Sequence, residues 1–465
     1  MTKKPDPIEE KLIADAFARL VPEASDLHKH YIKLNRLLHA AKYKDDIKSL
    51  GSAVQEMLKD REFSDWVARD KNVPKTLKTA QDCWLVAQRY LYRILWGRDY
   101  AGAALLIWGP DVFDPRPRSV GLIMGALKEA SLVNAMGGAS SGKTYSGVAW
   151  ALLDWILDPE WTLILLVGPD SDHLKRNMFG DLARLHEGSV IPLPGKLDTE
   201  SLSTNKIRGM GFLTVALDRG PGASAKLKGT KTKPRDAGDH PLFGRSARVR
   251  ILIDEAQQVP VNAWDMLINA ISNRESEEHL KIYCAANPSD ENSKYGKNCK
   301  PVGGWGSITP LQEQWMSETG WLTVRLNAML SENVKAAQAS DEFKRRKLVL
   351  FPRLISWDKV QHIIRGTGGD DQSADVYTQV YGMFPPAGSK QVVIKQTHVE
   401  AAKGEWIFVG PTTSYLTFDP AYSGDRPAVC AGRYGLAKGW MDYDGEIHKL
   451  DTAIKAVQVD SVGVI

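Results

Sequence analysis

The eight residues "GGASSGKT" (137–144) constrain the fold more than any other stretch, because of what flanks them. The apolar run "SLVNAM" before them is typical of a buried strand, and "TYSGVAWALLDWIL" after them is typical of a helix. Glycines in such a turn let backbone N–H groups surround an anion at the positive end of the helix. The order strand, glycine-rich turn, helix therefore predicts a phosphate-binding loop rather than a surface turn with a solvated lysine.

Each position of this loop has an expected role in binding ATP and Mg²⁺. Lys143 would bridge the β- and γ-phosphates, and the hydroxyl of Thr144 would hold the metal ion. The residues expected to bind the nucleotide are Gly137, Gly138, Ala139, Ser140, Ser141, Gly142, Lys143 and Thr144.

A second pair of candidate site residues follows the apolar run in "RILIDEAQQVP" (250–260). Asp254 and Glu255 come where this strand is expected to end. We expect Asp254 to bind Mg²⁺ through a water molecule and Glu255 to polarise the water that attacks the γ-phosphate. An acidic pair after an apolar strand is common, so the phosphate-binding loop upstream is what favours a catalytic interpretation.

The following strand, in "LKIYCAANPSD" (280–290), ends near Asn287. Ligands of open α/β sheets bind at the carboxyl ends of the strands. Asn287 is therefore a candidate sensor of the γ-phosphate, and a plain Asn-Pro turn is the alternative.

Apolar strands and helical stretches alternate through the middle of the chain, which predicts an α/β fold with a mostly parallel sheet covered on both faces. The expected strands lie in "SLVNAMGG", "WTLILLVGP", "GFLTVAL", "RVRILIDEA", "LKIYCAANP" and "WLTVRLN". We expect four parts: a helical N-terminal region (1–108), an ATPase domain (109–330), a helical linker or lid (331–410) and a strand-rich domain (411–465).

Composition restricts the partners and the compartment. The chain has 465 residues and a net charge of +4, which is too small to identify a nucleic-acid partner by itself. Its four cysteines are scattered, which favours a reducing compartment over a zinc site. Neither a signal peptide nor a long apolar run occurs in the sequence, so we expect an intracellular protein without a membrane span.

A basic, glycine-rich stretch before the Asp254 strand is a candidate contact for a nucleic-acid backbone, with a solvated surface as the alternative. Its cations outnumber Asp236 and Asp239; they are Lys226, Lys228, Lys231, Lys233, Arg235, Arg245, Arg248 and Arg250.

Taken in order, these segments resemble the large subunit of tailed-bacteriophage terminases, the motors that package DNA into procapsids. The residues that carry the resemblance are "GGASSGKT", "ILIDEAQQVP", "CAANP", "DVYTQVYGMFPPAG" (375–388) and "FDPAYSGDRPAV" (418–429). Many P-loop enzymes share the two ATPase motifs, whereas their order before "Y-x-x-x-x-G-x-F" and "D-P-A-x-x-G-D" is more specific. The resemblance runs from about residue 120 to the end of the chain.

The resemblance implies an ATPase that translocates double-stranded DNA and a C-terminal RNase H-like nuclease that cuts concatemers with two metal ions. Asp419 matches the first nuclease carboxylate and Asp425 the second, so both become candidate metal ligands. We expect this nuclease to be truncated here; completion by another polypeptide and inactivity are the alternatives. The remaining acids, which do not match the later acids of the family, are Asp442, Asp444, Glu446, Asp451 and Asp460.

The resemblance also implies partners: a terminase small subunit, a capsid portal and further copies of this chain. It places the protein in the host cytoplasm and transiently on the procapsid. Many family members carry an arginine within the phosphate loop, and this chain does not. Arg116, Arg118, Arg176 or an arginine of a neighbouring subunit could replace it, and each is otherwise a surface residue.

Two other interpretations remain open. "DEAQ" resembles the box of superfamily 2 helicases or translocases, but the chain after Asn287 lacks the arginine-rich motif of their second lobe. A non-catalytic ATP-binding DNA scaffold is the other, and Glu255 argues against it, because a static site needs no base to activate water.

Overall fold

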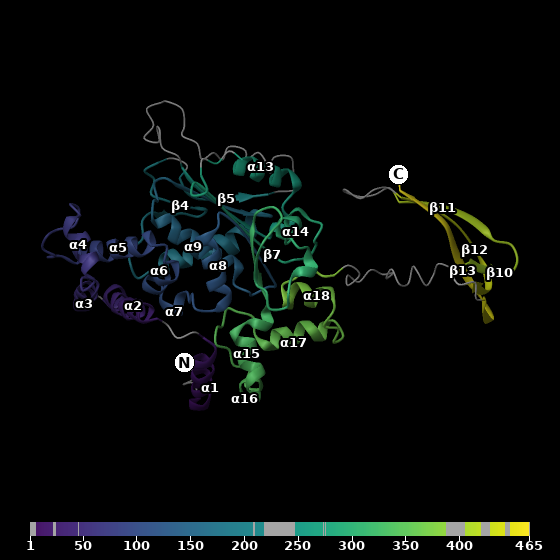
Figure 1. Ribbon diagram of the computed structural model, residues 1–465, viewed down its shortest axis with the longest axis horizontal. Coiled ribbons are helices and arrows are strands. Elements are labelled where there is room, and N and C mark those ends of the chain that lie inside the picture. The colour runs from purple at the N-terminus through teal and green to yellow at the C-terminus, as the bar shows by residue number, and fades with distance from the viewer. Residues whose placement is uncertain are drawn as a thin grey trace, which may run out of the picture. The chain divides into compact units, whose positions relative to one another are not determined.

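The computed structural model describes residues 6–21, 25–44, 46–207, 210–217, 247–272, 274, 276–386, 405–419, 428–441 and 447–464. These residues fall into two compact units, Met1–Pro385 and Pro386–Ile465. Helices dominate the start of the first unit, a sheet forms its centre, and the described part of the second unit consists of strands (Figure 1).

A nine-stranded sheet organises the first unit, in the order β3-β4-β5-β2-β6-β7-β1-β9-β8. The central strands from β5 to β9 are parallel, and antiparallel pairing occurs at the two edges. The strands are β1 (Leu132–Gly137), β2 (Thr162–Gly168), β3 (Lys196–Leu197), β4 (Ser201–Ser203), β5 (Gly211–Ala216), β6 (Arg248–Asp254), β7 (Leu280–Ala286), β8 (Gln314–Met316) and β9 (Leu322–Leu326). The expected α/β fold with a mostly parallel sheet is confirmed.

Side chains of the central strands alternate between two apolar layers. Leu252 of β6 packs into the layer that contains α8 (Arg118–Glu129) and α9 (Lys143–Ile156). Its neighbours Ile251 and Ile253 pack into the layer of α13 (Val261–Ser272) and α14 (Lys294–Cys299). Burial on both faces explains why this strand is a continuous apolar run rather than an alternating one.

The N-terminal helices between residues 26 and 112 share one continuous core with the sheet, whereas the first helix packs against apolar residues that follow the sheet. Leu91 and Leu105 belong to the same buried cluster as Trp150 of α9. The helices are α1 (Pro7–Leu20), α2 (Asp26–Lys44), α3 (Ile47–Met57), α4 (Arg61–Arg69), α5 (Ala80–Trp96), α6 (Tyr100–Ile107) and α7 (Gly109–Val112). The predicted helical region is confirmed, and it packs on the α/β core. None of the described helices combines the length and the apolar character needed to cross a bilayer.

Helices also follow the sheet, and a buried asparagine organises the loop between two of them. Asn333 Nδ2 donates to the carbonyl oxygens of Phe351 and Ile355, at 2.9 and 3.3 Å. Asn333 Oδ1 accepts from Leu350 N at 2.8 Å. The helices are α15 (Glu332–Ala339), α16 (Asp341–Arg345), α17 (Trp357–Gly366), α18 (Ala374–Val376) and the π-helical turn η5 (Tyr377–Tyr381).

Short elements complete the first unit. They are α10 (Ser171–Leu174), the π-helical turn η1 (Lys175–Phe179), α11 (Gly180–Gly188), and the 3-10 turns η2 (Ala256–Gln258), η3 (Trp305–Ser307) and η4 (Ala328–Leu330).

Arg248 and Arg250 correct one sequence-based expectation, because they do not belong to a basic nucleic-acid contact. Both lie at the start of β6 and pair with Asp154 near the end of α9, each at 2.7 Å. Asp154 and Arg250 are buried, and Tyr100 donates a further hydrogen bond to Asp154 at 3.1 Å. Arginines on a strand that is covered on both faces turn inward to a carboxylate, and here they join the phosphate-loop helix to β6.

The second unit is an antiparallel sheet in which β12 (Ala428–Met441) pairs with each of the other three described strands. Those strands are β10 (Glu405–Phe408), β11 (Thr413–Asp419) and β13 (Ile447–Val464). β10 precedes the expected start of this block at about residue 411 and still pairs with β12, so the strand-rich block already includes Glu405.

Candidate active site

The phosphate-binding loop starts where β1 ends at Gly137 and finishes where α9 begins at Lys143. Gly142 has φ +87°, a left-handed conformation that glycine adopts without the strain a Cβ would bring. Among the described side chains, none caps the start of α9. The first N–H groups of this helix are therefore available to an anion, which the helix dipole also favours.

Lys143 is buried at the floor of this loop. Its ammonium donates to the carbonyl oxygens of Gly137 and Gly138, at 2.5 and 2.8 Å, and to Ser141 Oγ at 3.2 Å. Burial lowers the pKa of Lys143 to about 8, against the opposing influence of nearby carboxylates. The loop thus holds one cation among oxygen atoms, where a phosphate oxygen would be a stronger partner than a carbonyl.

Asp254 lies at the carboxyl end of β6 and joins the two sequence motifs. Thr144 Oγ1 donates to Asp254 Oδ1 at 2.8 Å. Mg²⁺ prefers oxygen ligands and takes few of them from protein, keeping waters and substrate phosphates for the rest. A hydroxyl and a carboxylate side by side next to a phosphate-binding loop fit such an ion.

Glu255, the next residue, has a strained backbone. Its φ and ψ are 52° and 47°, in the left-handed region that residues with a Cβ rarely adopt. The side-chain amide of Gln257 donates to Glu255 Oε2. Strain of this kind persists where the surrounding structure fixes a residue, which is frequent at catalytic positions.

Asn287 lies between the two motifs, because β7 is inserted between β1 and β6 in the sheet. Its Oδ1 accepts from Lys143 Nζ at 3.2 Å. Asn287 follows β7 at the carboxyl edge of the sheet, as predicted, and this position brings its side-chain amide to the phosphate-binding loop. A polar group that touches Lys143 is well placed to respond to whatever Lys143 binds.

Two site residues were not predicted from the sequence. His173 of α10 follows β2, the strand beside β6, and its Nε2 lies 3.0 Å from Asp254 Oδ2. Tyr283 of β7 is buried, and its hydroxyl donates to Lys143 O at 2.9 Å. Tyr283 lies on the strand that precedes Asn287, which was the available signal, whereas no sequence signal places His173 beside Asp254.

The segment after the sheet packs on the outer side of the loop. Ala139 N donates to Gln379 Oε1 at 3.0 Å, and Lys359 Nζ donates to Ser140 Oγ at 2.9 Å. A Cβ built on Gly138 would lie 2.0 Å from the carbonyl oxygen of Gln379, so no larger residue fits there without movement. The quoted stretch 375–388 therefore contacts the phosphate-binding loop directly, through Gln379.

A cavity of about 500 Å³ opens beside the loop and the start of α9. Tyr145 lies at this cavity, with the guanidinium groups of Arg184 and Arg353 at 4.6 and 4.7 Å from its ring centre. The lining also includes Gly142 and Phe351, so the cavity offers an aromatic ring and two cations next to the loop.

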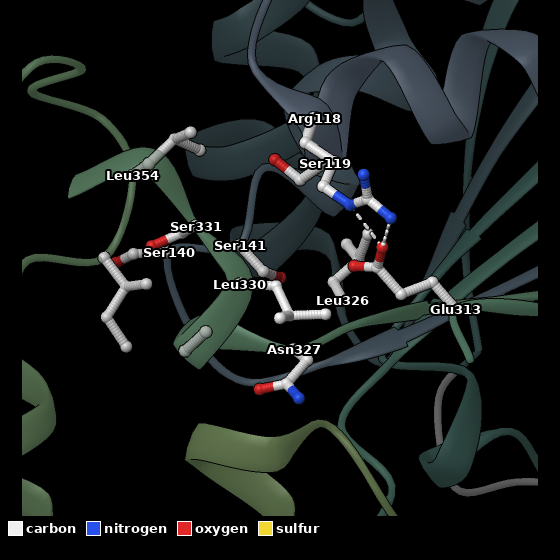
Figure 2. A pocket seen from close by; sticks show the side chains of 12 residues that line it. Arg118, Ser119, Ser140, Ser141, Glu313, Leu326, Asn327, Leu330, Ser331 and Leu354 are labelled. Carbon is white, nitrogen blue, oxygen red and sulfur yellow. Dashed lines mark hydrogen bonds and ion pairs between the residues drawn. The ribbon is translucent and has the colours of Figure 1, made fainter. Parts of the chain in front are cut away.

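The three candidate arginines differ in their surroundings. The guanidinium of Arg116 makes two hydrogen bonds to Asp114, at 2.8 and 2.6 Å. Arg118 forms an ion pair with Glu313 in a small pocket that Ser140 also lines, and Figure 2 shows the pair joined on one side of that pocket. Arg176 is exposed on η1.

Some expected residues lie outside the part of the chain that the structure describes. These are Asp425, the cations from Lys226 to Arg245, and Asp442, Asp444 and Glu446. Asp419 is the last residue of β11 and pairs with Ala428 of β12.

No protein-family model and no curated protein matches the chain. A comparison with solved structures finds large terminases at low similarity. The large terminase of the thermophilic bacteriophage D6E is 11% identical over 71% of this chain and 64% of that chain, with a TM-score of 0.34. The D6E large terminase in complex with ADP is 12% identical over 71% and 67%, with a TM-score of 0.35.

The large terminase of bacteriophage HK97 is 12% identical over 72% of this chain and 61% of that chain, with a TM-score of 0.33. This chain thus spans less than two thirds of the length of the HK97 terminase and of the first D6E structure.

Proposed function

We propose that this protein is a Mg²⁺-dependent ATPase whose site is the phosphate-binding loop together with Asp254, Glu255 and Asn287. The observation that carries the proposal is the 2.8 Å hydrogen bond between Thr144 Oγ1 and Asp254 Oδ1. It brings together the hydroxyl and the carboxylate that hold Mg²⁺ in P-loop enzymes.

Each residue has a distinct role. The ammonium of Lys143 binds the β- and γ-phosphate oxygens in place of the carbonyl oxygens it now contacts. Thr144 and Asp254 hold Mg²⁺, which supplies a Lewis acid that neutralises charge on the phosphates. Glu255 polarises the attacking water, because it is the carboxylate next to Asp254 at the same edge of the sheet.

Asn287 senses the γ-phosphate through Lys143. When Lys143 turns to a phosphate, the 3.2 Å contact with Asn287 Oδ1 weakens, and the change passes to the residue that follows. Pro288 O accepts a hydrogen bond from Thr378 Oγ1 at 3.1 Å, in the segment that also contacts the loop through Gln379. Loss of the γ-phosphate can therefore alter the position of that segment.

The cavity beside Tyr145 would receive the nucleoside. It adjoins the loop at Gly142, and its size falls within the range of small-molecule sites. The guanidinium of Arg353, which lies over the Tyr145 ring, offers a flat surface for stacking a base.

We further propose that the ATPase drives double-stranded DNA into a viral procapsid, as the large subunit of a terminase. Support comes from the order of motifs along the chain, with "DVYTQVYGMFPPAG" and "FDPAYSGDRPAV" after the ATPase residues. The proposed partners are DNA, a terminase small subunit, a capsid portal and further copies of this chain, in the host cytoplasm. Asp419 and Asp425 are proposed as metal-binding carboxylates of a nuclease, on the same resemblance.

The ATPase proposal is tested by comparing the wild type with Glu255→Gln. We expect the variant to bind ATP with unchanged affinity. Its rate of ATP hydrolysis should fall by a factor of about 100 or more, as expected when a general base is removed. A wild type that binds ATP without hydrolysing it would favour the scaffold interpretation. ATP-dependent unwinding of a forked DNA duplex would favour the helicase interpretation.

A further inference from the structure

His173 contacts the second oxygen of Asp254 and is itself held on its other nitrogen. Nε2 lies 3.0 Å from Asp254 Oδ2, and Nδ1 lies 3.1 Å from Asn177 Nδ2. An ionised carboxylate only accepts hydrogen bonds, so Nε2 carries the hydrogen and Nδ1 accepts from the amide of Asn177. The three side chains thus form a chain of hydrogen bonds with one direction, from Asn177 to Asp254.

The backbone under His173 is fixed as well. Asp170 accepts a hydrogen bond from His173 N at 2.7 Å and so caps the turn that follows β2. Leu174 is buried against Gly168, where an added Cβ would come within 2.9 Å of the leucine and 3.3 Å of the His173 ring. The ring is therefore held between a capped turn and the end of β2.

Together these contacts fix Asp254 on both oxygens. Oδ1 accepts from Thr144 and Oδ2 accepts from His173, and only 7% of the Asp254 side chain is exposed. A carboxylate held on one oxygen by the Thr144 hydroxyl and on the other by the His173 imidazole cannot rotate without losing a hydrogen bond. Partners of this kind set the orientation of metal ligands, and their removal costs about 10–100-fold in metal affinity or activity.

We propose that His173 is a positioning residue for a divalent metal: it orients Asp254 from Oδ2, so that Asp254 and the Thr144 hydroxyl would be poised to hold the ion, with Asn177 selecting the ring tautomer. This inference rests on the proposed ATPase function.

The test measures metal binding without turnover. Mn²⁺ serves as the probe, and its free concentration is followed by electron paramagnetic resonance with a non-hydrolysable ATP analogue present. We expect His173→Leu to weaken Mn²⁺ binding by about 10-fold or more, within the range for outer partners of metal ligands. His173→Gln, whose amide can donate to the same oxygen, should recover most of the loss, and Asn177→Leu should show a smaller loss.

His186→Gln is the matched control, since His186 is a half-buried histidine that contacts Pro194 O at 3.2 Å and not Asp254. It should leave Mn²⁺ binding unchanged. Unchanged or tighter Mn²⁺ binding in His173→Leu would overturn the proposal, and tighter binding would mean that His173 competes with the metal. ATP hydrolysis by the wild type, measured in parallel, reports on the ATPase proposal separately, because the metal titration does not depend on turnover.

Discussion

The hydroxyl of Thr144 lies 2.8 Å from the carboxylate of Asp254, although 110 positions separate the two residues in the chain. If both hold one Mg²⁺, Thr144→Val should lower ATP hydrolysis by about 10- to 100-fold, because it keeps the shape of the side chain and removes a metal-binding oxygen. Thr144→Ser, the matched control, should stay within a few-fold of the wild type. Steady-state phosphate release over a range of Mg²⁺ concentrations checks both.

Because the backbone of Glu255 is strained, replacing this residue with glycine should have different effects on stability and on activity. A residue with a Cβ at φ 52° costs roughly 1 kcal/mol relative to glycine. Glu255→Gly should therefore leave the free energy of unfolding unchanged or raise it by about 1 kcal/mol, while hydrolysis is lost with the carboxylate. Denaturant unfolding beside an ATPase assay decides this, and a variant that is clearly less stable would show that the conformation is not strained.

The lowered pKa of Lys143 predicts that ATP binding depends on pH. Burial lowers this pKa to about 8, and phosphate oxygens bind the protonated ammonium, so binding above pH 8 must take up a proton. ATP affinity should fall on the order of tenfold per pH unit above the pKa. The folded chain should itself gain stability as pH rises from about 8 to the ordinary value of 10.5, where the unfolded lysine binds more protons.

Calorimetric titration in buffers of different ionisation enthalpy measures this proton uptake directly. Lys143→Arg is the control, because a guanidinium stays protonated in this range. Equal proton uptake by the wild type and Lys143→Arg would show that another group is responsible.

The sequence was sufficient for the sheet and for the residues that the carboxyl ends of its strands bring together. Lys143, Thr144, Asp254 and Asn287 could be predicted because each follows or ends an apolar run, and parallel strands place those ends on one edge. His173 could not, because its role depends on β2 lying beside β6, and strand order is not visible in the residues themselves.

Charge patterns were a poorer guide than apolar patterns. Arg248 and Arg250 were grouped with a basic loop, since cations close in sequence share a sign but need not share a surface. Alternation along β6 turns both toward Asp154, a residue of a helix that sequence alone gave no reason to pair with them. The contact of Gln379 with the phosphate-binding loop was missed for a related reason, because it joins residues 240 positions apart.

The buried ion cluster predicts a large loss of stability in Asp154→Asn. Burial alone would raise the pKa of Asp154, but Arg250 and Arg248 outweigh it and lower the pKa to about 2. Removing the charge leaves two arginines without a counterion, which costs about 3–5 kcal/mol. Glu160→Gln, which breaks the exposed pair with Lys206, should cost no more than about 1 kcal/mol.

The same cluster sets the direction of the pH effect. The pKa of Asp154 in the folded chain lies below the ordinary 3.8. The stability that ionised Asp154 contributes to the fold is therefore complete above about pH 4 and is lost as pH falls toward 2. Denaturant unfolding at a series of acid pH values measures this, and Asp154→Asn should lack that part of the acid dependence.

The most direct test of the whole account is the rate of ATP hydrolysis with and without double-stranded DNA, in the wild type and in Lys143→Ala. We predict hydrolysis that DNA stimulates in the wild type and that falls to background in the variant under both conditions. ATP hydrolysis that persists in Lys143→Ala would contradict the proposed ATPase site. Wild-type hydrolysis that double-stranded DNA does not stimulate would contradict the proposed role in DNA translocation.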